Sequence, residues 1–128
     1  METRNKIDRL LERASQDEQV LAVMLFGSRA RGEQVDISDM DICLVLVPGN
    51  YEAVQLSRKK LQYLTGSDLD IHVYQQLPLY IRVRVLKEGR VLSCRDEDQL
   101  YAVAFKTIEQ FGDFEHGFRD YLRKVARA

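Results

Sequence analysis

The chain has 128 residues and a mass of 14.9 kDa, enough for one globular domain that buries about two thirds of its unfolded surface. Hydrophobic residues make up 45% and charged residues 30%, a composition that excludes a disordered or fibrous protein. Because 19 Lys and Arg face 20 Asp and Glu, the net charge is -1, and we expect no direct binding to nucleic acid.

The first part of the chain predicts one helix followed by two buried strands. Apolar residues recur at helical spacing before residues 15–18, where this helix should end: Ile7, Leu10, Leu11 and Ala14. Residues 20–26 and 40–47 are almost continuously apolar, as strands covered on both faces are. Both runs are far shorter than the roughly 18 residues of a membrane span. The N-terminus carries charges where a signal peptide is apolar, so we expect a cytoplasmic protein.

The middle of the chain predicts a helix, a strand, a short helix and a further strand. Asn50 is a candidate N-cap for a helix over residues 51–64, which Gly66 would close. Residues 68–74 alternate as a strand, with apolar Leu69, Ile71 and Val73 on one face. Pro78 opens a short helix to about residue 88, and residues 90–94 form a brief strand.

The C-terminal part is helical from about residue 96. Gly112 and Asp113 predict a stop and a new cap, so that a separate final helix would run from residue 114 to about residue 126. The chain contains no internal repeat or linker. We therefore expect a single domain over residues 1–128, of class α/β (α+β), with a small mixed β-sheet flanked by helices and a C-terminal helical extension.

A glycine and a serine follow the first strand directly. Gly27 would let backbone amides approach a phosphate, and Ser28 could cap a short helix while offering its hydroxyl. Such a turn directs amides and the helix dipole at an anion. Arg29 and Arg31 come next; each could reach a phosphate, or could equally be a solvated or carboxylate-paired arginine.

Acidic residues start the second and third strands. Asp39 and Asp41 lie two apart, on one face of an extended segment, with Cβ atoms about 6.5–7 Å apart. Their repulsion is on the order of 2–3 kcal/mol at an effective dielectric near 20, and Asp70 on the third strand would add to it. A divalent cation removes this penalty, and Mg²⁺ prefers such oxygen ligands together with substrate phosphates. His72 shares a face with Asp70 and could lie near the site, but a hydrogen-bonded structural histidine is the favoured interpretation.

The segment GSRARGEQVDISDMDICLV, in which ten residues separate Gly-Ser from Asp-x-Asp, resembles the signature of the polymerase-beta-type nucleotidyltransferase superfamily. The small size is similar to its minimal nucleotidyltransferase (MNT) branch. The resemblance implies the polymerase-beta-like nucleotidyltransferase fold, a triphosphate held by Gly27 and Ser28, and two Mg²⁺ ions bound by Asp39, Asp41 and Asp70. Asp68 competes with Asp70 for the third position.

The segments LKEGRVLSCRD and YAVAFKTIEQFGDF further resemble the MntA-type antitoxins of HEPN/MNT toxin–antitoxin modules. This resemblance implies transfer of AMP from ATP to a hydroxyl, typically of a tyrosine, on a partner HEPN ribonuclease toxin, which silences the toxin. In that reaction Asp70 would be the nearest candidate base, and one metal would position the acceptor hydroxyl while the other neutralises the departing pyrophosphate.

Two alternatives stay open. The chain could neutralise the toxin by binding alone, or could transfer a nucleotide to a small molecule. Against binding alone, a module without chemistry has no reason to keep repelling carboxylates together. The aromatic residues of the C-terminal part can pack on the sheet, form a protein-binding surface, or do both: Phe105, Phe111, Phe114, Phe118 and Tyr121.

Overall fold

The computed structural model describes residues 2–27, 41–65 and 69–127. Its elements follow one another along the chain as α1 (Glu2–Ser15), β1 (Val20–Phe26), β2 (Asp41–Leu46), α2 (Ala53–Leu64), β3 (Asp70–Val73), the 3-10 turn η2 (Tyr74–Gln76), α3 (Leu79–Glu88), β4 (Arg90–Cys94) and α4 (Glu97–Arg127). Within these residues one sheet has the strand order β3-β2-β1-β4.

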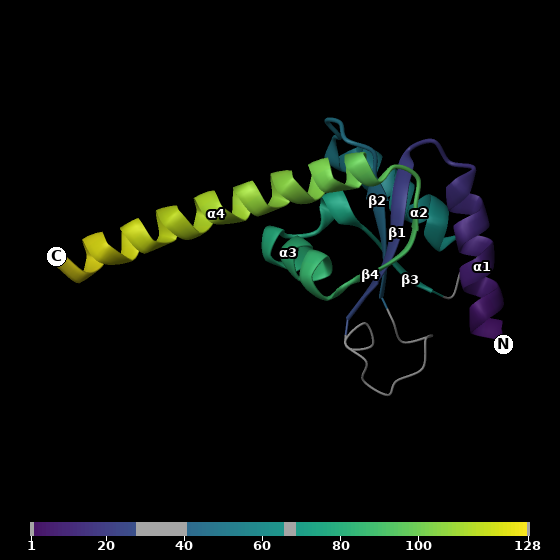
Figure 1. The fold of residues 1–128 in the computed structure, drawn as a ribbon, viewed down its shortest axis with the longest axis horizontal. Helices are drawn as coiled ribbons and strands as arrows, with labels where there is room; N and C mark the ends of the chain where they lie inside the picture. The colour runs from purple at the N-terminus through teal and green to yellow at the C-terminus, as the bar shows by residue number, and fades with distance from the viewer. Residues whose placement is uncertain (1, 28–40, 66–68, 128) are drawn as a thin grey trace.

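The sheet is mixed and lies between two helical layers. Strand β1 runs antiparallel to β2 and β4, whereas β3 runs parallel to β2 because α2 connects them as a crossover. Helices α1 and α2 cover one face, and α3 with the first part of α4 covers the other (Figure 1). The predicted class, α/β (α+β) with a small mixed sheet flanked by helices, is confirmed.

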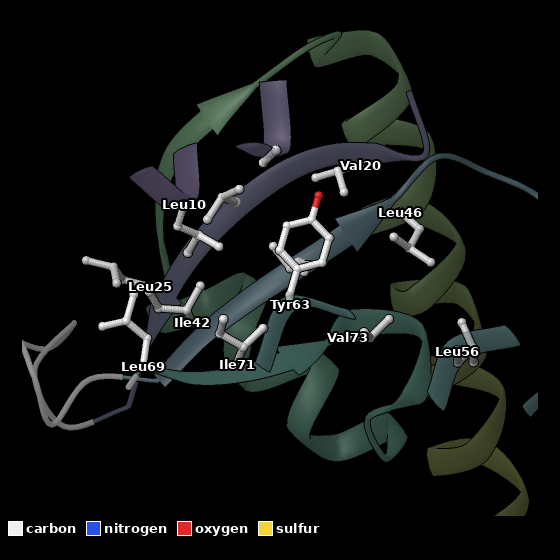
Figure 2. Close-up of a cluster of buried hydrophobic side chains, with 13 residues drawn as sticks. Leu10, Val20, Leu25, Ile42, Leu46, Leu56, Tyr63, Leu69, Ile71 and Val73 are labelled. Atoms are coloured by element: carbon white, nitrogen blue, oxygen red, sulfur yellow. The ribbon is translucent and has the colours of Figure 1, made fainter. Parts of the chain in front are cut away.

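The core beneath α1 and α2 is apolar and closely packed. Alternate residues of the strands, including Leu25, Ile42, Leu44 and Ile71, point into it from the sheet, and Leu10 reaches it from α1 (Figure 2). These side chains are at most 6% exposed, so the predicted burial of both apolar strands is correct. Alternation then directs the intervening strand residues toward α3 and α4.

A polar contact network joins α2 to the turn after α1. Asp17 accepts hydrogen bonds from Lys59 Nζ at 2.9 Å, from the Tyr63 hydroxyl at 2.8 Å and from the Gln19 amide at 3.0 Å. Partial burial opposes ionisation of this carboxyl, but the three donors outweigh it and hold its pKa below the ordinary value. Arg95 donates to the Ser15 and Asp17 carbonyls and ties β4 to the same corner.

The helix boundaries depart from the sequence prediction at two places. The predicted helix start at residue 51, with Asn50 as N-cap, is wrong: α2 begins at Ala53 and is capped by Glu52 in a reciprocal capping box with Gln55. The predicted break at Gly112 and Asp113 is wrong, because α4 continues unbroken through both. A glycine inside a helix costs only about 1 kcal/mol relative to alanine, and the long helical stretches on either side of it outweigh that cost.

Helix α4 extends far beyond the sheet (Figure 1). Its first turns pack on α3 and β1 through Leu100 and Val103. The buried Thr107 hydroxyl shares a hydrogen bond of 2.5 Å with the Tyr74 hydroxyl of η2. The distal half of α4 is exposed along most of its length. In the described part of the chain, no helix is both long and apolar enough to cross a membrane.

Candidate functional site

The candidate site lies where β1 ends and β2 and β3 begin. Phe26, the last residue of β1, pairs with Asp41, and Asp41 is the register partner of Asp70 on the parallel strand β3. Ile42 and Ile71, their next neighbours along the strands, point into the α1/α2 core. Because strand side chains alternate, both carboxylates face the side of the sheet that α3 and α4 cover.

Gly27 forms the corner beside these carboxylates. Its φ of +103° lies in the region that L side chains rarely adopt, and among the described residues only this glycine has a positive φ. A Cβ at this position would lie 3.1 Å from Asp41 Oδ2. The corner therefore needs a glycine both for its backbone conformation and for the close approach of Asp41.

Asp41 and Asp70 titrate as an interacting pair. Burial raises the pKa of Asp41, and the neighbouring Asp70 carboxylate raises it further, while His72 opposes the change. The hydrogen bond that Asp41 can donate when protonated lowers the pKa of Asp70, against a smaller effect of burial. When the pair holds a single proton, that proton resides on Asp41, which is 33% exposed, and Asp70, which is 63% exposed, carries the charge.

His72 lies between the two carboxylates. Its Nε2 is 3.3 Å from Asp41 Oδ1 and 3.3 Å from Asp70 Oδ1. Its ring meets the edge of the Phe26 ring, with centroids 5.6 Å apart and an interplanar angle of 69°. The sequence interpretation favoured a hydrogen-bonded structural histidine over a residue near the site and left His72 off the list of site residues, whereas its contacts are with both site carboxylates. The signal was its position two residues after Asp70, on the same strand face.

Asp41, Asp70 and His72 can hold a metal ion. Each offers one ligand atom, and the three atoms lie within 4.8 Å of one another. Two ionised carboxylates this close to each other repel, and a cation bound between them neutralises both charges. The donor set present thus fits a divalent cation.

The structure describes three of the predicted site residues and brings them together: Gly27 lies beside Asp41, and Asp70 pairs with Asp41 in register. The other predicted site residues lie outside the described part of the chain: Ser28, Arg29, Arg31 and Asp39. Asp68, the alternative to Asp70 as third carboxylate, also lies outside it.

Comparisons with known proteins agree with this geometry. The family model described as "Polymerase beta, Nucleotidyltransferase" matches residues 5–98, nearly three quarters of the chain. A curated relative from Methanocaldococcus jannaschii, named Putative protein adenylyltransferase MJ1547, is 33% identical over 101 residues, which cover 79% of this chain and 77% of the relative.

Solved structures share the fold. A chain of a toxin–antitoxin complex with AMP-PNP has a TM-score of 0.63 at 24% identity, covering 94% of this chain and 96% of the other. A chain from the complex of tri-AMPylated Shewanella oneidensis HEPN toxin with MNT antitoxin has a TM-score of 0.59 at 21% identity, covering 96% and 95%. The predicted polymerase-beta-like fold is therefore confirmed. By its match over residues 5–98 and its relationship to MJ1547, the chain belongs to the polymerase beta nucleotidyltransferase family and is a nucleotidyltransferase.

Proposed function

We propose that the chain is a Mg²⁺-dependent protein adenylyltransferase, which transfers AMP from ATP to a tyrosine hydroxyl of a HEPN-type toxin and so acts as its cytoplasmic antitoxin. The observation that carries this proposal is the convergence of Asp41 and Asp70 beside the Gly27 corner. The name of the M. jannaschii relative supports protein adenylylation, and the AMPylated toxin complex supports the partner class.

Different residues would bind the cation and the triphosphate. Asp41 and Asp70, with Asp39 from the same motif, would hold Mg²⁺, while Gly27 and Ser28 would hold the triphosphate with help from Arg29 or Arg31. Bound Mg²⁺ would neutralise phosphate charge and make the acceptor hydroxyl more acidic. The absence of a Cβ at Gly27 leaves its backbone free to approach both Asp41 and a phosphate.

Asp70 is the candidate to accept the proton of the acceptor hydroxyl. An aspartate is ionised at neutral pH, and the 63% exposure of Asp70 leaves it open to an incoming protein. The hydroxyl oxygen would attack the α-phosphorus of ATP, its proton would pass to the carboxylate, and the bond from the α-phosphorus to the pyrophosphate oxygen would break. The products are AMP-protein and pyrophosphate.

The distal half of α4 provides a surface for the acceptor protein. Apolar residues follow one another at intervals of three and four, the a/d spacing of a helix that pairs with another helix: Phe111, Phe114, Phe118, Tyr121 and Val125. The last four are about half exposed or more, and the rings of Phe114 and Phe118 stack with centroids 6.2 Å apart. We name Phe114, Phe118, Tyr121 and Val125 the distal stripe.

The distal stripe continues the face through which α4 packs on the body. At 100° per residue, Phe114 and Phe118 lie within about 60° of Leu100, Val103 and Thr107 around the helix axis. The face of α4 that packs on the body therefore continues along the part of the helix that extends past α3 (Figure 1). Since Asp41 and Asp70 face the same side of the sheet, a helical partner seated on this stripe would lie on the side from which the carboxylates are reached.

Incubation with labelled ATP and Mg²⁺ tests the activity, with the product of the neighbouring reading frame as acceptor and intact-mass spectrometry as readout. We expect a mass increase of one or more AMP units on the partner, and its loss in Asp41→Asn. Asp113→Asn, which removes an exposed carboxylate of α4, is the matched control and should retain the transfer. A stable complex without AMP on the partner would refute adenylylation and establish the binding-only antitoxin.

A second experiment tests the docking surface. The double variant Phe114→Ser, Phe118→Ser should weaken the complex at least about tenfold, because two aromatic anchors of an interface are removed. Phe105→Ser is its control, since Phe105 is 65% exposed and lies on the opposite face of α4 from Thr107. Equal affinities of all three proteins would exclude the distal stripe as the docking surface.

A further inference from the structure

We propose that His72 is itself a ligand of the cation held by Asp41 and Asp70, and that this nitrogen raises the affinity of the site for Mn²⁺ more than its affinity for Mg²⁺. The inference rests on the proposed function only in its premise that the carboxylates bind a cation. It changes the ligand set implied by the sequence, which contained oxygen atoms alone.

The spacing of the three ligand atoms fits one coordination sphere. In an octahedral site with bonds of about 2.1 Å, neighbouring ligand atoms are about 3.0 Å apart. Nε2 of His72 is 3.3 Å from an oxygen of each carboxylate, so two edges of such a sphere are nearly formed. All three atoms lie within 4.8 Å of one another, which leaves room for an ion between them.

The strand geometry fixes His72 in this position. It is two residues from Asp70 on β3 and pairs in register with Cys43 on β2, so it shares the sheet face of both carboxylates. The edge contact with the Phe26 ring holds the imidazole from the side of β1. Its side chain is 25% exposed, compared with 81% for His116, which lies on α4 beside Asp120.

A nitrogen ligand discriminates between the two metals. Mg²⁺ is a hard ion that takes oxygen ligands and gives up its waters reluctantly. Mn²⁺ also binds oxygen ligands, but as a first-row transition metal it accepts an imidazole nitrogen more readily than Mg²⁺ does. Mg²⁺ would therefore bind through the carboxylates with little contribution from His72, whereas Mn²⁺ would gain one bond from it.

Electron spin-echo spectroscopy on the Mn²⁺-loaded protein tests the bond directly, because it detects nitrogen bound to manganese. We expect a nitrogen modulation in the wild-type chain that changes when histidine is labelled with ¹⁵N. The chain has two histidines, so the source can be assigned with two variants. The modulation should vanish in His72→Gln and persist in the control His116→Gln.

Binding constants supply a second readout. In His72→Gln we expect the Kd for Mn²⁺, measured from the free-ion signal, to rise at least about tenfold, and the Kd for Mg²⁺, measured by competition, to change less than about threefold. Mn²⁺ bound through Asp41 without a nitrogen signal would overturn this inference and leave the proposed function standing. Failure of either ion to bind, together with no AMP transfer, would overturn both.

Discussion

The carboxylate pair predicts that one substitution will abolish activity and stabilise the fold. Asp41→Asn removes a charge from the pair while keeping its size, and the new amide can still donate a hydrogen bond to Asp70 as the protonated acid does. Without a cation, the wild-type chain bears the repulsion of two carboxylates within 4.8 Å of each other at neutral pH. The Asp41→Asn variant does not bear this repulsion.

The magnitude follows from the distance and the exposure. Two unit charges 4.8 Å apart repel by about 3.5 kcal/mol at an effective dielectric of 20, and by about 0.9 kcal/mol in bulk water. Because Asp70 is 63% exposed, the value near the aqueous limit applies, and we expect a gain of about 1–2 kcal/mol. This corresponds to a rise in Tm of about 3–8 °C for a chain of this size.

The gain in stability of Asp41→Asn over wild type should increase with pH. The pKa of Asp41 is raised by burial and by Asp70, so the folded protein holds this proton more tightly than the unfolded chain does. Wild-type stability therefore falls as the pH rises from the unfolded value, about 3.9, through the raised folded value. The difference between Asp41→Asn and wild type should be full at pH 8 and should disappear below about pH 4.

Urea unfolding in EDTA, at pH 8 and at pH 4, measures this difference. In saturating Mg²⁺ the order should reverse, because a ligand at 100 times its Kd stabilises the wild-type fold by about 2.7 kcal/mol and binds the variant weakly. AMP transfer should fall at least about a thousandfold in the variant. If Asp41→Asn is less stable than wild type at pH 8 in EDTA, the two carboxylates do not repel each other as described.

Three further predictions concern residues elsewhere. Asp17→Asn should destabilise the fold by about 2–3 kcal/mol at pH 7, since charged hydrogen bonds are lost. Because the pKa of Asp17 is lowered in the folded wild-type protein, the difference in free energy of unfolding between wild type and variant should shrink as the pH falls below about 4. Gly27→Ala should lower the free energy of unfolding by about 1–3 kcal/mol, because residue 27 has a φ of +103° and the added Cβ would press on Asp41. The variant should also bind ATP more weakly in calorimetry. An unchanged Kd for ATP would contradict this role of Gly27. Gly112→Ala should raise the free energy of unfolding by about 0.5–1 kcal/mol, because a Cβ there would meet no atom of the described residues within 4 Å and the helix continues through it; a loss on urea unfolding would argue against a continuous α4.

The sequence by itself determined the fold class and the motif spacing. The apolar runs identified β1 and β2, because a strand covered on both faces is apolar at consecutive positions. The predicted strand at residues 90–94 matches β4 at both ends, although none of its residues is buried. The Gly-Ser and Asp-x-Asp spacing selected Gly27 and Asp41 as candidate site residues, and the structure places them beside each other. Local propensities were sufficient for these features since each depends on neighbours a few positions away.

Only the tertiary structure decided which residues meet across strands. The register of β2 and β3 places Asp70 opposite Asp41 and brings His72 within 3.3 Å of both carboxylates, and this pairing depends on α2 and on the α1/α2 core. The continuity of α4 through Gly112 likewise depends on its surroundings, since no described residue packs against that position to turn the chain there. The local sequence determines which segments favour helix or strand. Strand register and helix packing depend instead on the free energy of contacts between segments that are distant in the chain.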